Sequence, residues 1–186
     1  MKTILFLLLI TTISCKSQIF PLNTNLDDVP YNGYIKDLDN ELDKYVGIWV
    51  GNWNGKTLSI EFKKVKDHRN HPQYPYYKDR IFGERKVVSS NGVVEIDRIT
   101  NFDFDSPEIR GPFRSYSGEE KFLFSPKNMC RKRVSLYIKS FTTTQMTLHF
   151  EYEPSYYDAD CQHNAYEQQY GDFPVNFPKD IVLTKQ

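Results

Sequence analysis

The sequence has no net charge, only three cysteines, and no long apolar run at its start. The first apolar run, from Ile4 to Ile10, is seven residues long, whereas a membrane-spanning helix needs about 20. A permanent transmembrane helix is therefore not expected there. The 24 basic and 24 acidic residues cancel, so neither a surface for nucleic acid nor an acidic tail is expected.

Several catalytic signatures are also missing. The chain contains no Gly-x-Ser-x-Gly, no phosphate-binding glycine loop and no Cys-x-x-Cys. Serine hydrolases, nucleotide-binding proteins and zinc-binding modules commonly carry these motifs. We therefore expect no cofactor, and the sequence leans away from an enzyme.

What the N-terminus does contain is an export signal. Met1-Lys2-Thr3 precedes the apolar run, and small residues follow it up to Cys15, which is typical of a secreted precursor. A cysteine at this boundary indicates cleavage after residue 14 and attachment of lipid to Cys15. The sequence predicts a lipoprotein signal over 1–14 and a lipid-anchored protein of the cell envelope, at the outer membrane or on the periplasmic side. Leucine usually stands where this chain has Thr12, so soluble export after cleavage behind Ser17 remains the alternative.

The other two cysteines then form an even pair. If Cys15 carries lipid, Cys130 and Cys161 are left in an oxidising compartment, where a disulfide is expected. Two free thiols are the alternative.

The rest of the chain has the pattern of antiparallel strands. Asn54-Gly55 predicts a tight hairpin, and after it Leu58, Ile60 and Phe62 alternate with polar residues, as on a half-buried strand. Asn91-Gly92 predicts a second hairpin in which Val94 and Ile96 face inward. Polar residues 66–77 and 154–178 are expected to form loops, and Leu38 and Leu42 a short helical turn before the first strand.

These elements predict one all-β domain. Residues 15–33 are expected to be a tether, and residues 34–186 an antiparallel, eight-stranded barrel of lipocalin-like architecture, with the last strand closing on the first. Closure removes the exposed edges that an open sheet must protect.

Two resemblances support this architecture. At Gly47-Ile48-Trp49 the chain resembles lipocalin-type barrels, in which such a glycine allows close backbone approach and the indole plugs the closed end. Lipocalins also carry an arginine that crosses this tryptophan near the last strand. That arginine is not evident in this chain, where Lys185 is the nearest basic residue and a poor substitute.

The second resemblance covers nearly the whole chain, and it is to a family of small Bacteroidota lipoproteins with no assigned activity. It implies export and a single β domain, and no catalytic residue. It is carried by Ser14-Cys15-Lys16-Ser17-Gln18, Tyr34-Ile35-Lys36-Asp37, residues 42–49, Phe82-Gly83-Glu84 and residues 178–185.

Candidate chemistry is sparse. His68 with His71, or Asp158-Ala159-Asp160 with His163 and Asn164, offer metal-ligand atoms without a complete ligand set, so no metal is expected. Asp103 with Asp105, or Glu95 with Asp97, would supply the paired carboxylates of a hydrolase.

Tyrosines concentrate in the two long loops and form a candidate binding rim, because an exposed ring offers both contact area and a hydroxyl. The candidates are Tyr74, Tyr76, Tyr77, Tyr156 and Tyr157, and loop packing is the other interpretation. The sequence thus predicts a non-enzymatic envelope protein that binds a small apolar ligand or a protein partner. The alternatives are an envelope hydrolase and a purely structural interaction module.

Overall fold

The computed structural model describes residues 18–186, apart from 71–73, 128, 131, 133 and 153–158. The described residues form the following elements: β1 (Ile19–Pro21), η1 (Leu26–Asp28), β2 (Tyr34–Lys36), β3 (Gly47–Trp53), β4 (Lys56–Arg69), β5 (Tyr76–Val88), β6 (Val94–Asp97), β7 (Ile109–Arg114), β8 (Glu120–Phe124), β9 (Val134–Phe141), β10 (Gln145–Tyr152), α2 (Asn164–Tyr170) and β11 (Asp180–Lys185).

The chain divides into two compact units. The first comprises residues 1–38 and 67–79, and the second comprises residues 39–66 and 80–186. Strands β4 and β5 contribute residues to both units. Residues 19–33 were expected to belong to a tether. They instead contribute β1 and η1 to the first unit.

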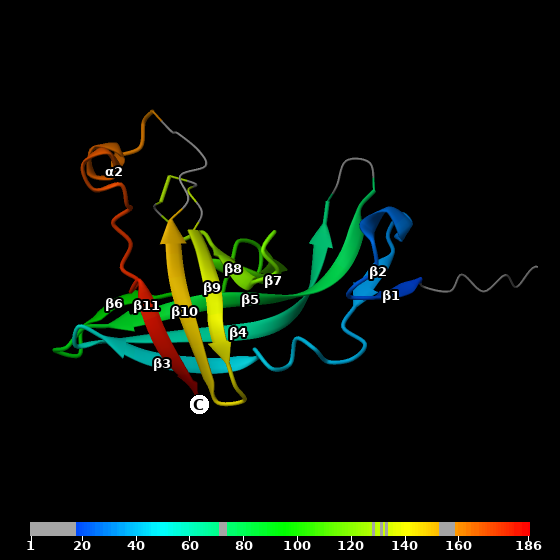
Figure 1. The fold of residues 1–186 in the computed structure, drawn as a ribbon, viewed down its shortest axis with the longest axis horizontal. Coiled ribbons are helices and arrows are strands. Elements are labelled where there is room, and N and C mark those ends of the chain that lie inside the picture. The colour runs from blue at the N-terminus through cyan, green and yellow to red at the C-terminus, as the bar shows by residue number, and fades with distance from the viewer. Residues whose placement is uncertain (1–17, 71–73, 128, 131, 133, 153–158) are drawn as a thin grey trace, which may run out of the picture. The chain divides into compact units, whose positions relative to one another are not determined.

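The second unit is a closed barrel of eight strands, as predicted. The barrel consists of β3–β5 and β7–β11, and β6 is not part of it. Each barrel strand pairs with the next barrel strand along the chain, in the sheet order β5-β4-β3-β11-β10-β9-β8-β7. Pairing of β5 with β7 closes the barrel on one side (Figure 1). The last strand pairs with the first through Thr184–Val50 and Lys185–Trp49, which confirms the predicted closure.

The hairpin of β3 and β4 follows directly from its sequence. Asn54 and Gly55 have φ angles of 48° and 77°, the left-handed backbone that a two-residue hairpin turn requires. The register runs from Gly47–Phe62 to Trp53–Lys56. It turns Leu58, Ile60 and Phe62 into the barrel, where all three are fully buried.

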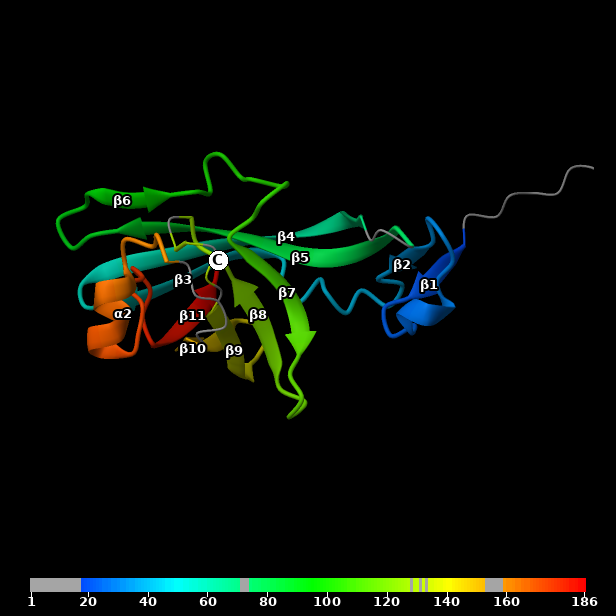
Figure 2. The ribbon, with the colours of Figure 1, turned by 90° about the horizontal axis from the view of Figure 1, so that it is seen from above.

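The second predicted hairpin forms, but the prediction of its inward residues is wrong. Strand β6 pairs with the end of β5, with a register shift between Val87 and Val88, and it lies outside the barrel path (Figure 2). Val94 is consequently 49% exposed, and Ile96 is only half-buried. The loop predicted over residues 66–77 is also shorter, since β4 continues to Arg69 and β5 begins at Tyr76.

The predicted helical turn is a series of tight turns instead. The amides of Asp43, Tyr45 and Val46 each donate to the carbonyl three residues earlier. Leu42 is buried, whereas Leu38 is 52% exposed, so the two leucines do not form one apolar face.

The first unit is built around short parallel strands. Strand β1 pairs in parallel with β2, and β2 pairs in parallel with the start of β5. Its core consists of Val29, Ile35 and Tyr76, with Phe20 and Leu22 packed against them. Asp79 joins the strands by accepting hydrogen bonds from the Tyr34 hydroxyl at 2.6 Å and from the amide of Asp37 at 2.9 Å.

We predict that Gly83 is needed for packing inside the barrel. A Cβ atom at this position would lie 2.6 Å from Cε1 of Phe62 and 3.1 Å from Cβ of Ile109. Gly83→Ala should therefore lower the free energy of unfolding by about 1–3 kcal/mol in urea titrations. Phe62→Leu removes the ring that the new Cβ would meet. In the Phe62→Leu background, Gly83→Ala should therefore lower the free energy of unfolding clearly less than it does in the wild type. Equal costs in both backgrounds would contradict this packing.

Candidate functional site

The barrel interior is filled by large side chains. Phe62 and Phe122 stack at its centre, with ring centroids 4.9 Å apart and an interplanar angle of 19°. Their exposed fraction is zero, as is that of Trp49, Ile60 and Leu136. Since a side chain next to a water-sized space would retain some accessible surface, no such space adjoins these residues.

Aromatic side chains also close both ends of the barrel. At the start of β8, Tyr45 packs edge-on against Phe122 and Phe141, with centroids at 5.4 and 5.1 Å. At the other end of β8, Phe177 packs against Phe124 at 5.1 Å and against Phe150 at 6.1 Å. Among the described residues, the interior therefore presents no opening to a ligand.

The Gly47–Trp49 motif closes the first end. Trp49 is fully buried, and its Nε1 donates to the carbonyl of Tyr45 at 2.7 Å. Gly47 has a φ of 126°, and a Cβ there would lie 3.2 Å from Cε of Lys185. Lys185 crosses the indole with Nζ 5.4 Å from a ring centroid and donates to the carbonyl of Lys44 at 3.1 Å. Lys185 and Trp49 therefore pack together at this end of the barrel.

A buried ion pair joins β5 to the segment before β7. Arg85 donates from Nε to Oε2 of Glu108 at 2.9 Å, and its side chain is 5% exposed. The guanidinium also donates to the carbonyl of Asn176 at 2.6 Å and lies 5.0 Å from the ring centroid of Phe124. Glu108 accepts a further bond from the amide of Lys127 at 3.3 Å. Each charge is thus compensated by several partners, as a buried pair requires.

Glu84 is a second buried carboxyl near this pair, and it is poorly compensated. Its side chain is fully buried, and neither oxygen makes a well-formed hydrogen bond to a described residue. Arg98 Nε lies 3.5 Å from Oε2. Burial, reinforced by the negative charge of Glu108, raises the pKa of Glu84 to about 7, although Arg98 and the backbone of Asp103 oppose the shift. The folded protein therefore holds Glu84 largely protonated below neutral pH.

A buried carboxyl with a raised pKa, such as that of Glu84, next to a second carboxyl is an arrangement that general acid–base chemistry can use. Here, however, Glu84 and Glu108 are buried on every side by protein. A glycosidic or ester substrate has no described route to them, so the pair fits a role in the fold better than a role in hydrolysis.

The carboxylate pairs predicted from the sequence lie at the surface, and three of the four carboxylates are ion-paired. Glu95 accepts from Lys56 at 2.7 Å, and Asp97 accepts from Lys86 at 2.8 Å. Asp103 accepts from Lys127 at 2.8 Å and from the amide of Asp105 at 3.1 Å. Hydrogen bonds from these lysines lower the pKa values of Glu95, Asp97 and Asp103. All three are therefore poor general acids at neutral pH.

The predicted disulfide is present. Cys130 and Cys161 are bonded, with their Cα atoms 5.6 Å apart. The same region holds a buried ion pair, in which Lys132 donates to Glu167 of α2, and the Tyr152 hydroxyl donates to the same carboxylate at 2.6 Å. Although burial alone would raise it, these bonds hold the pKa of Glu167 below its usual value.

The predicted tyrosine rim is divided by the structure. Tyr74 is 40% exposed, whereas Tyr76 is buried in the core of the first unit. Tyr77 is half-buried and packs against His68 at 4.8 Å between centroids. Tyr76 is therefore a packing residue and not a contact for a partner. Tyr156 and Tyr157 lie outside the described residues.

The metal-ligand candidates that fall within the described residues do not come together. Within the described part of the chain, no group of three or more histidine, cysteine, aspartate or glutamate side chains is placed to hold a metal ion. His163 instead contacts Gln162 at 3.1 Å, and Asn164 donates to the carbonyl of Ala159 at 3.2 Å. His71 and Asp158 fall among residues that are not described.

One serine–lysine contact has no counterpart in the sequence predictions. Lys121 Nζ lies 2.9 Å from Oγ of Ser135, on neighbouring strands β8 and β9. Such pairs can activate a serine nucleophile. Ser135 is only 3% exposed, and it lies within a strand ladder that uses its backbone groups, so it lacks both access and free amides for an oxyanion.

The fold and these contacts define a closed, up-and-down β-barrel with a filled interior. The described residues contain no helix long and apolar enough to cross a membrane. The chain belongs to the family of unknown function DUF6705, which it matches over residues 1–186. No curated protein and no solved structure matches significantly, and the resemblance to lipocalins is thus not confirmed.

The buried charges of β5 and of the segment before β7 were not predicted from the sequence. Arg85 stands an even number of residues from Ile81 and Val87, so on a strand its side chain lies on the same face as theirs. This spacing was a signal that Arg85 points inward. Nothing local distinguishes Glu84 or Glu108, because their burial depends on the pairing of β5 with β7, and Arg85 and Glu108 stand 23 residues apart.

We predict that Glu84 makes the stability of the protein depend on pH. Its pKa is about 7 in the folded protein, against 4.5 for an ordinary glutamate in the unfolded chain. Its contribution is therefore most favourable below pH 4.5 and is lost as the pH rises through 7. The difference in unfolding free energy between Glu84→Gln and the wild type should therefore change by about 2–3 kcal/mol in favour of Glu84→Gln as the pH rises from 5 to 8.

Urea unfolding at several pH values measures this difference. Asp105→Asn, at an exposed carboxyl, serves as the control and should follow the wild type. Parallel stability curves for Glu84→Gln and the wild type would contradict the assigned titration.

Proposed function

We propose that this protein is a lipid-anchored, non-enzymatic protein of the cell envelope that acts by binding a protein partner with its outer surface. The observation that supports this most is the filled interior, sealed by Tyr45 and Trp49 at one end and by Phe177 at the other. A carrier of small apolar ligands needs an open cavity instead. The ligand-binding interpretation is therefore the weaker one.

The disulfide supports export. Cys130–Cys161 is a bond typical of proteins outside the cytoplasm. With these two cysteines paired, Cys15 is the single cysteine left for acylation. It follows the short apolar run at the distance expected of a lipoprotein signal.

A lipocalin-like architecture is consistent with the closed end. Gly47, Trp49 and Lys185 lie together at this end of the barrel, and this supports the proposed resemblance. In this chain the arrangement serves to seal the barrel and not to border a binding cavity.

The hydrolase alternative retains one favourable observation, the raised pKa of Glu84 close to a second carboxyl, that of Glu108. Their complete burial weighs against it. Measurable hydrolysis of glycan or ester substrates that disappears in Glu84→Gln and in Glu108→Gln would favour it over a binding role.

The anchor is tested by the mass of the mature protein. In cells that process lipoproteins, the purified protein should begin at Cys15 and carry three acyl chains, which disappear in Cys15→Ala. The wild type should partition with membranes, since each buried methylene contributes about 0.8 kcal/mol, whereas Cys15→Ala should not. A mature wild-type protein that begins at Gln18 without lipid would show soluble export instead.

A further inference from the structure

The first unit exposes apolar and aromatic side chains next to the point where the described chain begins. Ile19 is 47% exposed, Tyr31 is 69% exposed and Tyr74 is 40% exposed. We name these three residues the anchor-end surface. They lie near the starts of the three parallel strands β1, β2 and β5.

Parallel pairing brings these strand starts to one end of the unit. Ile19 pairs with Tyr34, and Tyr34 pairs with Tyr77. The amide of Tyr34 donates to the carbonyl of Gln18 at 3.0 Å, and the amide of Tyr77 donates to that of Gly33 at 2.9 Å. Since parallel strands share their direction, the residues preceding each strand lie at the same end.

A further bond brings the two tyrosine-bearing segments together. The amide of Asn32, next to Tyr31, donates to the carbonyl of Pro75, next to Tyr74, at 2.7 Å. The chain enters the unit through Gln18 at this same end. The anchor-end surface and the N-terminal entry point are therefore neighbours.

The connection to Cys15 is short. Three residue steps separate Cys15 from Gln18, and a fully extended chain covers at most about 3.6 Å per residue, or about 11 Å in total. The tether expected over residues 15–33 would have held the fold far from a membrane. With β1 beginning at Ile19, a lipid on Cys15 would hold this end of the first unit within about 15 Å of the lipid attachment point.

We propose that the anchor-end surface lies in the headgroup layer of the bilayer that holds the lipid on Cys15. This inference rests on the acylation proposed above. Tyrosine rings favour this layer because they combine an apolar body with a polar hydroxyl. Ile19 contributes apolar area beside them.

The contact is apolar and not electrostatic. The described residues of the first unit carry five acidic side chains (Asp27, Asp28, Asp37, Asp67 and Asp79) and three basic ones (Lys36, Arg69 and Lys78), which gives a net charge of 3 − 5 = −2. This net charge gives the described part of the unit no overall attraction to anionic lipid. The contact should therefore form on neutral phosphatidylcholine and persist at high salt.

The test compares two labelled positions in the full, acylated protein. Tyr31→Cys and Leu38→Cys each introduce one free thiol, because Cys130 and Cys161 are paired. Both positions are exposed, at 69% and 52%, and they flank opposite ends of β2. Each variant is labelled with a polarity-sensitive fluorophore and reconstituted into phosphatidylcholine vesicles that contain nitroxide-headgroup lipid.

We expect the emission maximum of the label at position 31 to lie at shorter wavelength than that of the label at position 38. Nitroxide lipid should also quench the label at position 31 at least about twofold more, because only this position lies at the end that enters the headgroup layer. High salt should change this little. Tyr74→Cys provides a second reading at the same end if Tyr31→Cys does not fold. Equal quenching at both ends, or emission typical of water at position 31, would overturn the inference.

The two proposals fail in different ways. An intact mass without acyl chains removes the anchor, and the membrane contact falls with it. An acylated protein whose position-31 label remains in water removes the membrane contact alone.

Discussion

The barrel depends on the dense packing of aromatic rings along its axis. Phe62 and Phe122 stack at the centre, Tyr45 and Trp49 seal one end, and Phe177 covers the other. Gly83 is needed because the ring of Phe62 occupies the space that a Cβ would take. Among the described residues, this packing leaves no water-sized space beside these rings, and the proposed binding role is therefore assigned to the outer surface.

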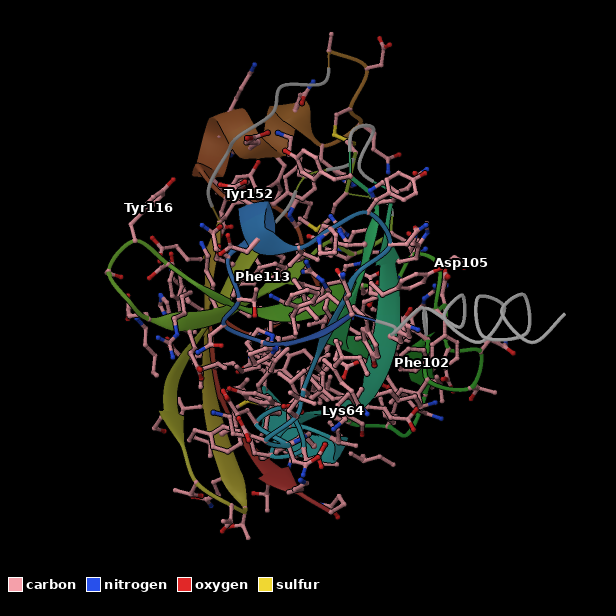
Figure 3. The ribbon with its side chains drawn as sticks, turned by 90° about the vertical axis from the view of Figure 1, so that its right-hand side faces the viewer. Lys64, Phe102, Asp105, Phe113, Tyr116 and Tyr152 are labelled. Atoms are coloured by element: carbon pink, nitrogen blue, oxygen red, sulfur yellow. A yellow bond between two sulfur atoms is a disulfide. The ribbon has the colours of Figure 1, made fainter. Side chains whose placement is uncertain are left out.

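The same packing sets limits on the buried charges. Arg85 and Glu108 are tolerated because hydrogen bonds satisfy both groups. The nearest cation to Glu84 is Arg98 at 3.5 Å, and a raised pKa is the physical result, because a buried carboxyl with weak donors is more stable when neutral. The exposed carboxylates Asp97 and Asp103, in contrast, have lysine partners and lowered pKa values. Asp103 lies between β6 and β7, close in sequence to the exposed Asp105 that is labelled in Figure 3.

Local patterns predicted the barrel well. Asn54-Gly55 and the alternation of Leu58 and Ile60 specified the first hairpin, and cysteine parity predicted Cys130–Cys161. The first unit was not predicted, because β1 and β2 are three residues long and have too few positions to show periodicity. Glu84 acquires its role only through contacts with residues distant in the sequence, so no local pattern identifies it.

The filled interior is tested most directly by uptake of a small apolar probe. Benzene titrated into the wild-type protein and into Phe122→Ala, and followed by NMR, compares the natural interior with an opened one. A cavity of the size that this truncation leaves binds such molecules in other proteins. We expect saturable binding by Phe122→Ala and none by the wild type. Saturable binding of benzene within the wild-type barrel would contradict a sealed, fully packed interior.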